Sequence, residues 1–272
     1  MKNYTLNSLD QNSKIFPLQA FSDNYIWVIT HKNSAAVIDP GQAKPVTEFL
    51  YLNGLKLKAI LLTHFHDDHI SGVEELISNN RITVYGPSVE KNLLPFCNIL
   101  LKGGDIVNLT DLNTYLNVLD VPGHTQGHIA YYGRVGEDSN ALFPGDTLFS
   151  GGCGRVFNGT TFQLFKSLEL LSNLPVSTKI YSGHEYTINN LRWAMVVDPD
   201  NIYLKKYYEK VNYLKKEGLP TLPSSIQTEL EINPFFRTWN LSIAKSASLK
   251  ANKKLNTKFR IFTELRKWKD KY

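Results

Sequence analysis

Residues 61–70 read LLTHFHDDHI, in which the apolar pattern of a buried strand runs directly into three histidines and two aspartates. His64 and His66 stand at positions i and i+2, so both side chains can point the same way from the end of an extended segment. Asp68 and His69 follow at the start of a predicted helix, from which they can face the same cavity. Imidazole and carboxylate are ligands that zinc, iron and manganese accept, so the stretch predicts a metal site. An ordinary surface cluster of histidines is the alternative that this stretch alone leaves open.

Three more metal-capable residues follow predicted strands later in the chain. They are His124 in VPGHT, Asp146 in FPGDT and His184 in YSGHE. Sites assemble at the ends of strands in open α/β sheets, so these separate segments are expected to converge on one place. With the four residues of the first stretch they make seven potential ligands, which is too many for one tetrahedral ion and suits two.

Two metal ions would make a water molecule the nucleophile. Ions held about 3.5–4 Å apart lower the pKa of a shared water from 15.7 towards about 7, and they stabilise the oxyanion that forms when hydroxide adds to a carbonyl. A carboxylate shared between the ions would complete their coordination, and Asp68 could orient the hydroxide. No serine or cysteine nucleophile is then required.

Three residues near the predicted ligands are explained more simply by a structural role than by metal binding or catalysis. His128 in GHTQGHI is expected to be a structural histidine beside the site, since only one of the two histidines in that stretch need bind metal. Asp67 can cap the predicted helix instead of binding an ion. Cys153 in GGCGR could be a reactive thiol, but its flanking glycines more simply indicate a close backbone turn.

Short apolar runs that end in Gly, Asp or His predict the strands of the first part of the chain. These runs cover residues 25–30, 35–39, 57–63, 81–85, 116–121, 129–134, 141–144 and 179–181. Helical patterns lie between some of them, at residues 44–53, 72–79 and 161–172. Strands and helices in this order indicate an α/β sandwich.

The sequence becomes helix-dominated after residue 185, with no further clear strand. Apolar positions from Tyr203 to Leu214 are spaced for one helix face, and this helix is expected to stop near Gly218. Residues 258–272 have the pattern of a basic amphipathic helix. The predicted organisation is a catalytic domain of residues 1–184 and a helical domain of residues 185–272.

The composition and the cysteine content favour a cytoplasmic setting. The 272 residues are 42% hydrophobic and 20% charged, and the net charge of +5 falls short of the dense basic surface that nucleic-acid binding usually needs. Cys97 and Cys153 cannot form a disulfide framework, which favours a reducing compartment. The opening residues 1–14 carry no signal-peptide pattern, and no apolar run approaches bilayer-spanning length. Neither nucleic acid nor membrane is expected as a partner, and a monomer is expected by default.

Four stretches of this sequence resemble a known enzyme family. THFHDDH matches the T-H-x-H-x-D-H signature of the metallo-β-lactamase superfamily, and GHTQGHI, GDTLFSGGCGR and GHEYTINNL resemble stretches of glyoxalase II, the hydroxyacylglutathione hydrolases. The similarity runs from FSDNYIW near the start to LRKWKDKY at the end. It implies an αββα sandwich followed by a smaller α-helical C-terminal domain that binds glutathione. It also implies a thioesterase that converts S-(2-hydroxyacyl)glutathione, chiefly S-D-lactoylglutathione, to glutathione and D-lactate in methylglyoxal detoxification, by attack of a metal-bridging hydroxide.

The resemblance implies a role for each metal ligand. It assigns His64, His66 and His124 to one ion, Asp68, His69 and His184 to a second, and Asp146 to a bridge between them. Asp68 and Asp146 would take part in catalysis as well as in metal binding. The expected cofactor is two divalent ions per chain, taken as zinc, with iron or manganese as alternatives.

The resemblance also implies a set of substrate residues. They are Arg155 and Phe157 around GGCGR, Tyr186 in GHEYT, and Arg266 and Lys269 in LRKWKD. The last two would hold the glycine carboxylate of glutathione, since cations at i and i+3 share one helix face. A solvated basic face is the alternative for this pair. Some family members have lysine in place of Arg155 and tyrosine in place of Phe157, so the affinity for glutathione is expected to differ.

Other activities fit these residues less well. A persulfide dioxygenase would use one iron ion and would not need Asp68, His69 and His184. A lactonase or β-lactamase would not need Arg266 and Lys269, and a nuclease would need a larger basic surface. A non-catalytic zinc module would be expected to have a closed site rich in cysteine. The metal in each site and the preferred acyl group stay open.

Overall fold

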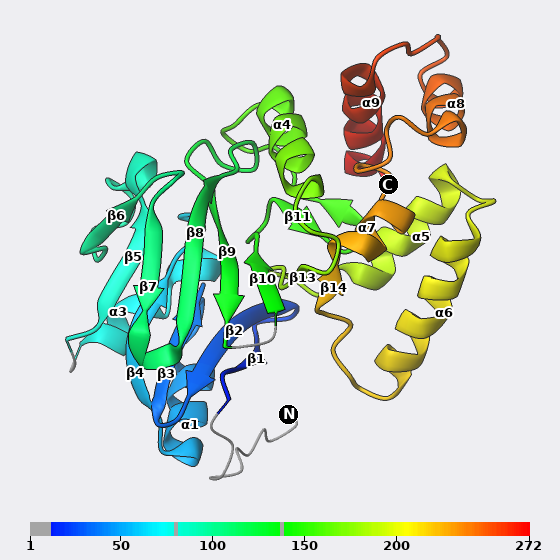
Figure 1. Cartoon of the computed structure of the whole chain (residues 1–272). Coiled ribbons are helices and arrows are strands. Elements are labelled where there is room, and N and C mark those ends of the chain that lie inside the picture. Colours follow the sequence, from blue (N-terminus) through cyan, green and yellow to red (C-terminus); the bar gives the residue numbers. More distant parts are fainter. Residues whose placement is uncertain (1–11, 79–80, 137–138) are drawn as a thin grey trace. The chain divides into compact units, whose positions relative to one another are not determined.

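The computed structural model of the chain describes residues 12–78, 81–136 and 139–272 (Figure 1). Contacts between residues divide the chain into two compact units. Unit 1 consists of residues 1–120 and 127–145, and unit 2 consists of residues 121–126 and 146–272. The predicted lack of a signal peptide at residues 1–11 and the predicted helical position Asn79 lie outside the described residues. The domain boundary predicted after residue 184 stays a prediction.

Unit 1 contains a six-stranded sheet whose strands follow the order of the chain. The strands are β1 (Lys14–Ala20), β2 (Asn24–His31), β3 (Ser34–Ile38), β4 (Lys56–Leu61), β5 (Thr83–Pro87) and β6 (Ile99–Leu101). Strands β1 to β3 pair antiparallel, and β3 to β6 pair parallel. Every residue of β3 is buried, as expected of a strand that is covered on both faces.

Helices pack against this sheet through apolar side chains. Helix α1 (Ala43–Asn53) connects β3 to β4, while α2 (Asp67–Ile70) and α3 (Val73–Ile77) lie between β4 and β5. Val46 of α1 and Val73 of α3 belong to the same buried cluster as Ile60 of β4. The two parallel connections therefore bring the carboxyl end of β4 and the start of α2 to the edge of a packed core.

Four further strands of unit 1 pair antiparallel in chain order. They are β7 (Ile106–Leu109), β8 (Thr114–Asp120), β9 (Ile129–Val135) and β10 (Ser139–Phe143), and short 3₁₀ helices cover Ser88–Glu90 and Thr110–Leu112. The Tyr131 hydroxyl of β9 donates to the carbonyl of Leu62 at 2.8 Å, and the amide of Ile129 donates to the carbonyl of Thr63 at 3.0 Å. These bonds join β9 to the chain just before His64, and the predicted α/β sandwich is confirmed.

Unit 2 is mainly helical. Its elements are β11 (Leu148–Phe149), β12 (Gly152–Cys153), α4 (Thr161–Ser172), β13 (Lys179–Ile180), α5 (Thr187–Val197), α6 (Ile202–Lys216), β14 (Ser224–Ser225), α7 (Ile226–Ile232), α8 (Leu241–Lys250) and α9 (Lys258–Asp270). Side chains cap several of these helices, and Thr160 and Gln163 form a reciprocal capping box at the start of α4. Trp193 stacks on Phe235 at 5.3 Å, and Phe235 meets Phe262 at 5.4 Å, so aromatic rings fill the core between α5 and α9.

Several elements differ from the sequence prediction. The expectation of no strand after residue 185 is wrong, because Ser224 and Ser225 pair with β13. A strand of two residues has no periodicity to detect. Strand β1 was also not predicted, since Pro17 interrupts its pattern, and proline is accommodated there because β1 lies at the sheet edge. Among the described residues, the structure has no helix with the length and apolar character needed to cross a membrane.

Candidate metal centre and substrate residues

Unit 1 contributes the four ligands predicted in residues 64–69. Nε2 of His64 lies 3.1 Å from Nδ1 of His66, and Nε2 of His69 lies 3.5 Å from a carboxylate oxygen of Asp68. Two nitrogens bound about 2.0–2.1 Å from one tetrahedral zinc ion would lie about 3.3 Å apart, which is close to these spacings. The short helix α2 begins at Asp67, with His66 before it, so the backbone turns between the two pairs.

Asp39, which the sequence analysis did not single out, orients two of these ligands. It is buried at the end of β3, and its carboxylate accepts hydrogen bonds from the amide of Thr63 at 2.8 Å and from the Thr63 hydroxyl at 2.7 Å. Nδ1 of His69 lies 3.1 Å from the same carboxylate, and Nδ1 of His64 lies 3.0 Å from the Thr63 hydroxyl. Both histidines can therefore donate from Nδ1, which leaves Nε2 as the metal-binding nitrogen. The only sequence signal was an aspartate directly after a buried strand.

Two more residues of unit 1 support the ligands without replacing them. Asn24 donates from its side-chain amide to the Asp68 carboxylate at 2.8 Å. The buried ring of His128 stacks on His64, with ring centres 4.6 Å apart and an angle of 21° between the planes. This contact agrees with the structural role predicted for His128.

Unit 2 contributes the other three predicted ligands, His124, Asp146 and His184, all of them buried. A single oxygen of Asp146, Oδ2, lies 3.6 Å from Nε2 of His124 and 3.3 Å from Nε2 of His184. His124 is oriented through its other nitrogen, because Nδ1 donates to the carbonyl of Arg155 at 2.9 Å. One carboxylate oxygen between two imidazoles is the arrangement expected of a bridging ligand.

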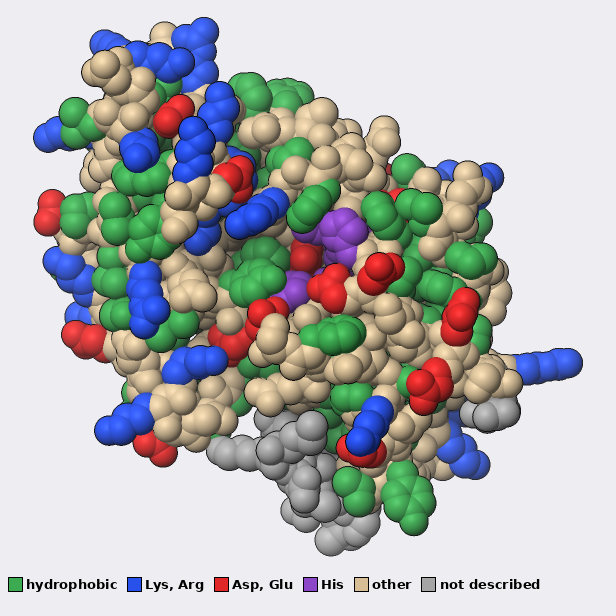
Figure 2. Space-filling model, turned by 180° about the vertical axis from the view of Figure 1, so that it is seen from behind, with side chains coloured by type: hydrophobic (Ala, Val, Ile, Leu, Met, Phe, Trp, Pro, Cys, Tyr) green, Lys and Arg blue, Asp and Glu red, His purple; other side chains and the backbone are tan. Residues whose placement is uncertain are grey.

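The donor atoms of both units fit divalent metal ions. They are imidazole nitrogens and carboxylate oxygens, and the second nitrogen of His64, His69 and His124 has a protein partner that fixes the metal-binding tautomer. Histidine side chains are visible at the molecular surface, bordered by acidic side chains, in Figure 2. Some histidine side chains of this protein are therefore exposed to solvent.

The five predicted substrate residues all lie in unit 2. Arg155 and Phe157 are exposed, and Tyr186 is half-buried and stacks on His184, with ring centres 4.6 Å apart. Phe157 meets the ring of His124 edge-on at 5.1 Å. Two of the predicted substrate residues are thus in direct contact with predicted metal ligands of the same unit.

Arg266 and Lys269 do not form a solvated basic face. Arg266 is only 4% exposed and donates to the carbonyls of Cys153 at 2.9 Å and Gly154 at 3.2 Å. The Lys269 ammonium lies 5.1 Å from the ring centre of Trp193. Burial and the neighbouring Arg266 lower the pKa of Lys269 to about 8. The outer face of α8 and α9, by contrast, carries many exposed Lys and Arg side chains (Figure 2).

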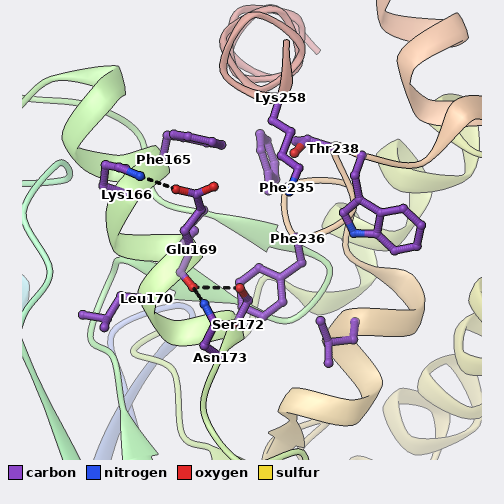
Figure 3. A pocket seen from close by; sticks show the side chains of 13 residues that line it. Phe165, Lys166, Glu169, Leu170, Ser172, Asn173, Phe235, Phe236, Thr238 and Lys258 are labelled. Atoms are coloured by element: carbon purple, nitrogen blue, oxygen red, sulfur yellow. Dashed lines mark hydrogen bonds and ion pairs between the residues drawn. The ribbon is translucent and has the colours of Figure 1, made fainter.

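A separate cavity of about 570 Å³ lies in unit 2 between α4 and the segment that follows α7. Phe165, Phe235 and Trp239 line it, and Lys166 forms an ion pair with Glu169 at 2.7 Å on its wall (Figure 3). None of the predicted metal ligands or substrate residues lines this cavity. It is therefore distinct from the predicted site.

Comparisons with known proteins agree with these motifs. Residues 21–97 match the family model described as the metallo-beta-lactamase superfamily, and residues 185–272 match the model described as the hydroxyacylglutathione hydrolase C-terminus. A protein of Nitrosomonas eutropha named hydroxyacylglutathione hydrolase is 44% identical over 258 residues, which cover 95% of this chain and 98% of that protein. One of Aliivibrio fischeri with the same name is 46% identical over 257 residues, covering 94% and 98% of the two chains.

Solved structures support the fold. The crystal structure of the B3 metallo-beta-lactamase BLEG-1 superposes with a TM-score of 0.61 at 24% identity, covering 82% of this chain and 99% of that one. The crystal structure of ETHE1 from Myxococcus xanthus superposes with a TM-score of 0.52 at 30% identity, covering 64% and 76%. The metallo-β-lactamase fold predicted from the sequence is thereby confirmed.

Proposed function

The chain belongs to the hydroxyacylglutathione hydrolase family, and from this premise we propose that it hydrolyses S-(2-hydroxyacyl)glutathione thioesters, chiefly S-D-lactoylglutathione, to glutathione and D-lactate. This reaction would complete the detoxification of methylglyoxal. The observation that carries the proposal is the position of Asp146 Oδ2, 3.6 Å from Nε2 of His124 and 3.3 Å from Nε2 of His184. A carboxylate oxygen shared in this way suits a centre of two ions.

The seven predicted ligands divide between two proposed ions. The first would be held by His64, His66 and His124, the second by Asp68, His69 and His184, and Asp146 would bridge them. Zinc is the proposed metal, because the donors are nitrogen and oxygen and the spacings suit bonds of about 2 Å. Two such ions would supply a nucleophilic hydroxide at neutral pH and positive charge for the oxyanion.

The chain's own residues position the reacting groups. The Asp68 carboxylate is fixed by the amide of Asn24 at 2.8 Å, so it can accept a hydrogen bond from the attacking water and hold it in one orientation. The glutathione part of the substrate would be bound by the five predicted substrate residues, Arg155, Phe157, Tyr186, Arg266 and Lys269. Of the last two, Lys269 is the better candidate for the glycine carboxylate, since Arg266 already donates to two carbonyls. Phe157 can pack on the tripeptide but has no hydroxyl to donate.

We place this enzyme in the cytoplasm as a monomer, with a catalytic domain of residues 1–184 and a glutathione-binding domain of residues 185–272. Both cysteines are free thiols, which suits a reducing compartment. Glutathione is itself the cytosolic thiol, so substrate and compartment agree.

Purified protein is expected to hydrolyse S-D-lactoylglutathione rapidly and to contain about two metal ions per chain. Removal of metal with a chelator should abolish turnover, and added zinc should restore it. The measurement is thioester absorbance loss together with metal analysis of the same sample. A fully metallated protein that leaves this thioester intact, while it opens a lactone or a β-lactam, would contradict the proposal.

The KM for S-D-lactoylglutathione is expected to rise above about pH 8, because Lys269 loses its proton there and with it the charge that binds the carboxylate. Replacing Lys269 by Met should raise KM about 10- to 100-fold at neutral pH and remove this pH dependence, since one charged hydrogen bond contributes about 1.5–3 kcal/mol. Lys269→Arg is the matched control, because arginine keeps its charge and should keep KM low at high pH. Equal pH profiles for wild type and Lys269→Met would exclude this role.

A further inference from the structure

The hairpin of β11 and β12 connects a proposed metal ligand to a proposed substrate residue. It follows Asp146 and precedes Arg155, and its register pairs Phe149 with Gly152. Gly151 in the turn has a φ of +68°, a conformation that glycine adopts without strain. The position of this hairpin therefore affects the geometry at both of its ends.

The C-terminal end of the hairpin packs directly on the ligands of unit 2. A Cβ atom on Gly154 would collide with the carbonyl oxygen of Asp146 and would lie 3.0 Å from Nδ1 of His124. The carbonyl of Arg155, the next residue, accepts the hydrogen bond that orients His124. Any shift of this segment would therefore move the backbone of one ligand and release the ring of the other.

Two buried side chains of the α7 segment bind the other end of the hairpin. Glu229 is fully buried and accepts from the amide of Gly151 at 2.8 Å and from the hydroxyl of Ser224 at 2.7 Å. Asn233, also fully buried, donates to the carbonyls of Gly152 at 3.0 Å and Phe149 at 3.3 Å and to the Glu229 carboxylate at 3.0 Å. The side chains of Glu229 and Asn233 therefore both form hydrogen bonds with the backbone of the hairpin.

Side chains from two other helices complete this set. Asn190 of α5 donates to the carbonyl of Ser150 at 3.1 Å, and Arg266 of α9 donates to the carbonyls of Cys153 and Gly154. Side chains of the helical part of the chain therefore donate hydrogen bonds to five backbone carbonyls of this segment. They are the carbonyls of residues 149, 150, 152, 153 and 154. These bonds fall on six consecutive residues, 149–154, of the eight that separate Asp146 from Arg155.

We propose that Glu229 and Asn233 are positioning residues that hold the β11–β12 hairpin so that Asp146 and His124 keep their metal-binding geometry. The inference rests on the proposed function of Asp146 and His124 as ligands. Both would act through the backbone of residues 149–152, whose amide and carbonyl groups they bind. The C-terminal family region would then contribute to metal binding as well as to the binding of glutathione.

The zinc affinity of metal-free protein tests this role, measured by competition with a chromophoric chelator. Asn233→Ala is expected to weaken zinc binding about tenfold or more, and Glu229→Gln several-fold, since loss of groups that orient ligands costs about 10–100-fold. Asn201→Ala is the matched control, because Asn201 is a buried helix cap that bonds to Asp198 and Glu231 and does not contact the hairpin. Circular dichroism selects conditions under which every variant is folded.

Zinc affinity in folded Asn233→Ala and Glu229→Gln within about twofold of the wild type would overturn the inference. Equal weakening in Asn201→Ala would also overturn it, because it would indicate general loosening of the protein. The visible spectrum of the Co²⁺-substituted protein should change in Asn233→Ala and stay unchanged in Asn201→Ala. These measurements need no thioester, so their result is separate from that of the substrate assay.

Discussion

Replacing Asp146 by alanine is expected to lower kcat/KM for S-D-lactoylglutathione by at least about 10³-fold and to remove metal from the protein. Its Oδ2 atom lies 3.6 Å from Nε2 of His124 and 3.3 Å from Nε2 of His184. Without it, two proposed ions would lose a common ligand, and their positive charges would repel each other without the negative charge between them. Metal analysis after dialysis and steady-state kinetics measure both effects.

Two control variants distinguish the loss of the Asp146 charge from general effects of mutation. They are Asp146→Asn and Asp200→Ala. Asp146→Asn keeps the size of the side chain but removes its charge, so it should lose nearly as much activity as Asp146→Ala. Asp200 is an exposed aspartate of unit 2 in the turn between α5 and α6, and Asp200→Ala should behave as wild type. Two tightly bound ions and activity within tenfold of wild type in Asp146→Ala would show that the bridging assignment is wrong.

The proposed ligands were accessible to sequence analysis because each lies where an apolar run ends. In the structure, β4 (Lys56–Leu61) ends three positions before His64, and β10 ends at Phe143, three positions before Asp146. Helix α4 begins and ends where its pattern predicted, at Thr161 and Ser172, since a capping residue precedes it and a regular apolar face defines it. Local pattern therefore predicts elements that are long, periodic and capped.

The residues that orient the ligands could not be predicted in the same way. Asp39, Glu229 and Asn233 belong to no recognisable motif, and each acts on a segment distant in sequence. Nothing in spacing or composition distinguishes Glu229 from the other glutamates of the chain. Its role depends on the amide of Gly151, 78 positions away, which only the folded chain brings within reach.

Arg266 illustrates the same limit within a correctly predicted helix. The spacing of Arg266 and Lys269 correctly indicates one face of α9. It does not indicate that Arg266 is buried against the carbonyls of Cys153 and Gly154, whereas Lys269 lies beside Trp193. Helical periodicity reports which residues share a face, but the partner of each depends on what that face packs against.

Replacing Asp39 by asparagine is expected to weaken zinc binding about 10–100-fold although the size of the side chain hardly changes. The amide of Thr63 requires an acceptor at 2.8 Å, so the asparagine oxygen must take the place of Oδ1. Its NH₂ group would then replace Oδ2 and point at Nδ1 of His69 and at the Thr63 hydroxyl. Since His69 would accept at Nδ1, its proton would move to Nε2, and the metal-binding nitrogen would be blocked.

The comparison of Asp39→Asn with Asp39→Ala distinguishes this tautomer effect from loss of stability. Alanine removes an acceptor from buried donors and is expected to lower the free energy of unfolding by about 3 kcal/mol, while asparagine should cost less because it keeps one bond to Thr63. If orientation of His69 decides metal affinity, asparagine must weaken zinc binding at least as much as alanine in spite of its higher stability. Asp105→Asn is the control, because Asp105 lies in the turn between β6 and β7 of the same unit and its carboxylate accepts from the amide of Lys102 at 2.9 Å. Wild-type zinc affinity in Asp39→Asn would mean that the charge of Asp39 does not set the tautomer, and that its contribution lies in packing the end of β3 against Thr63.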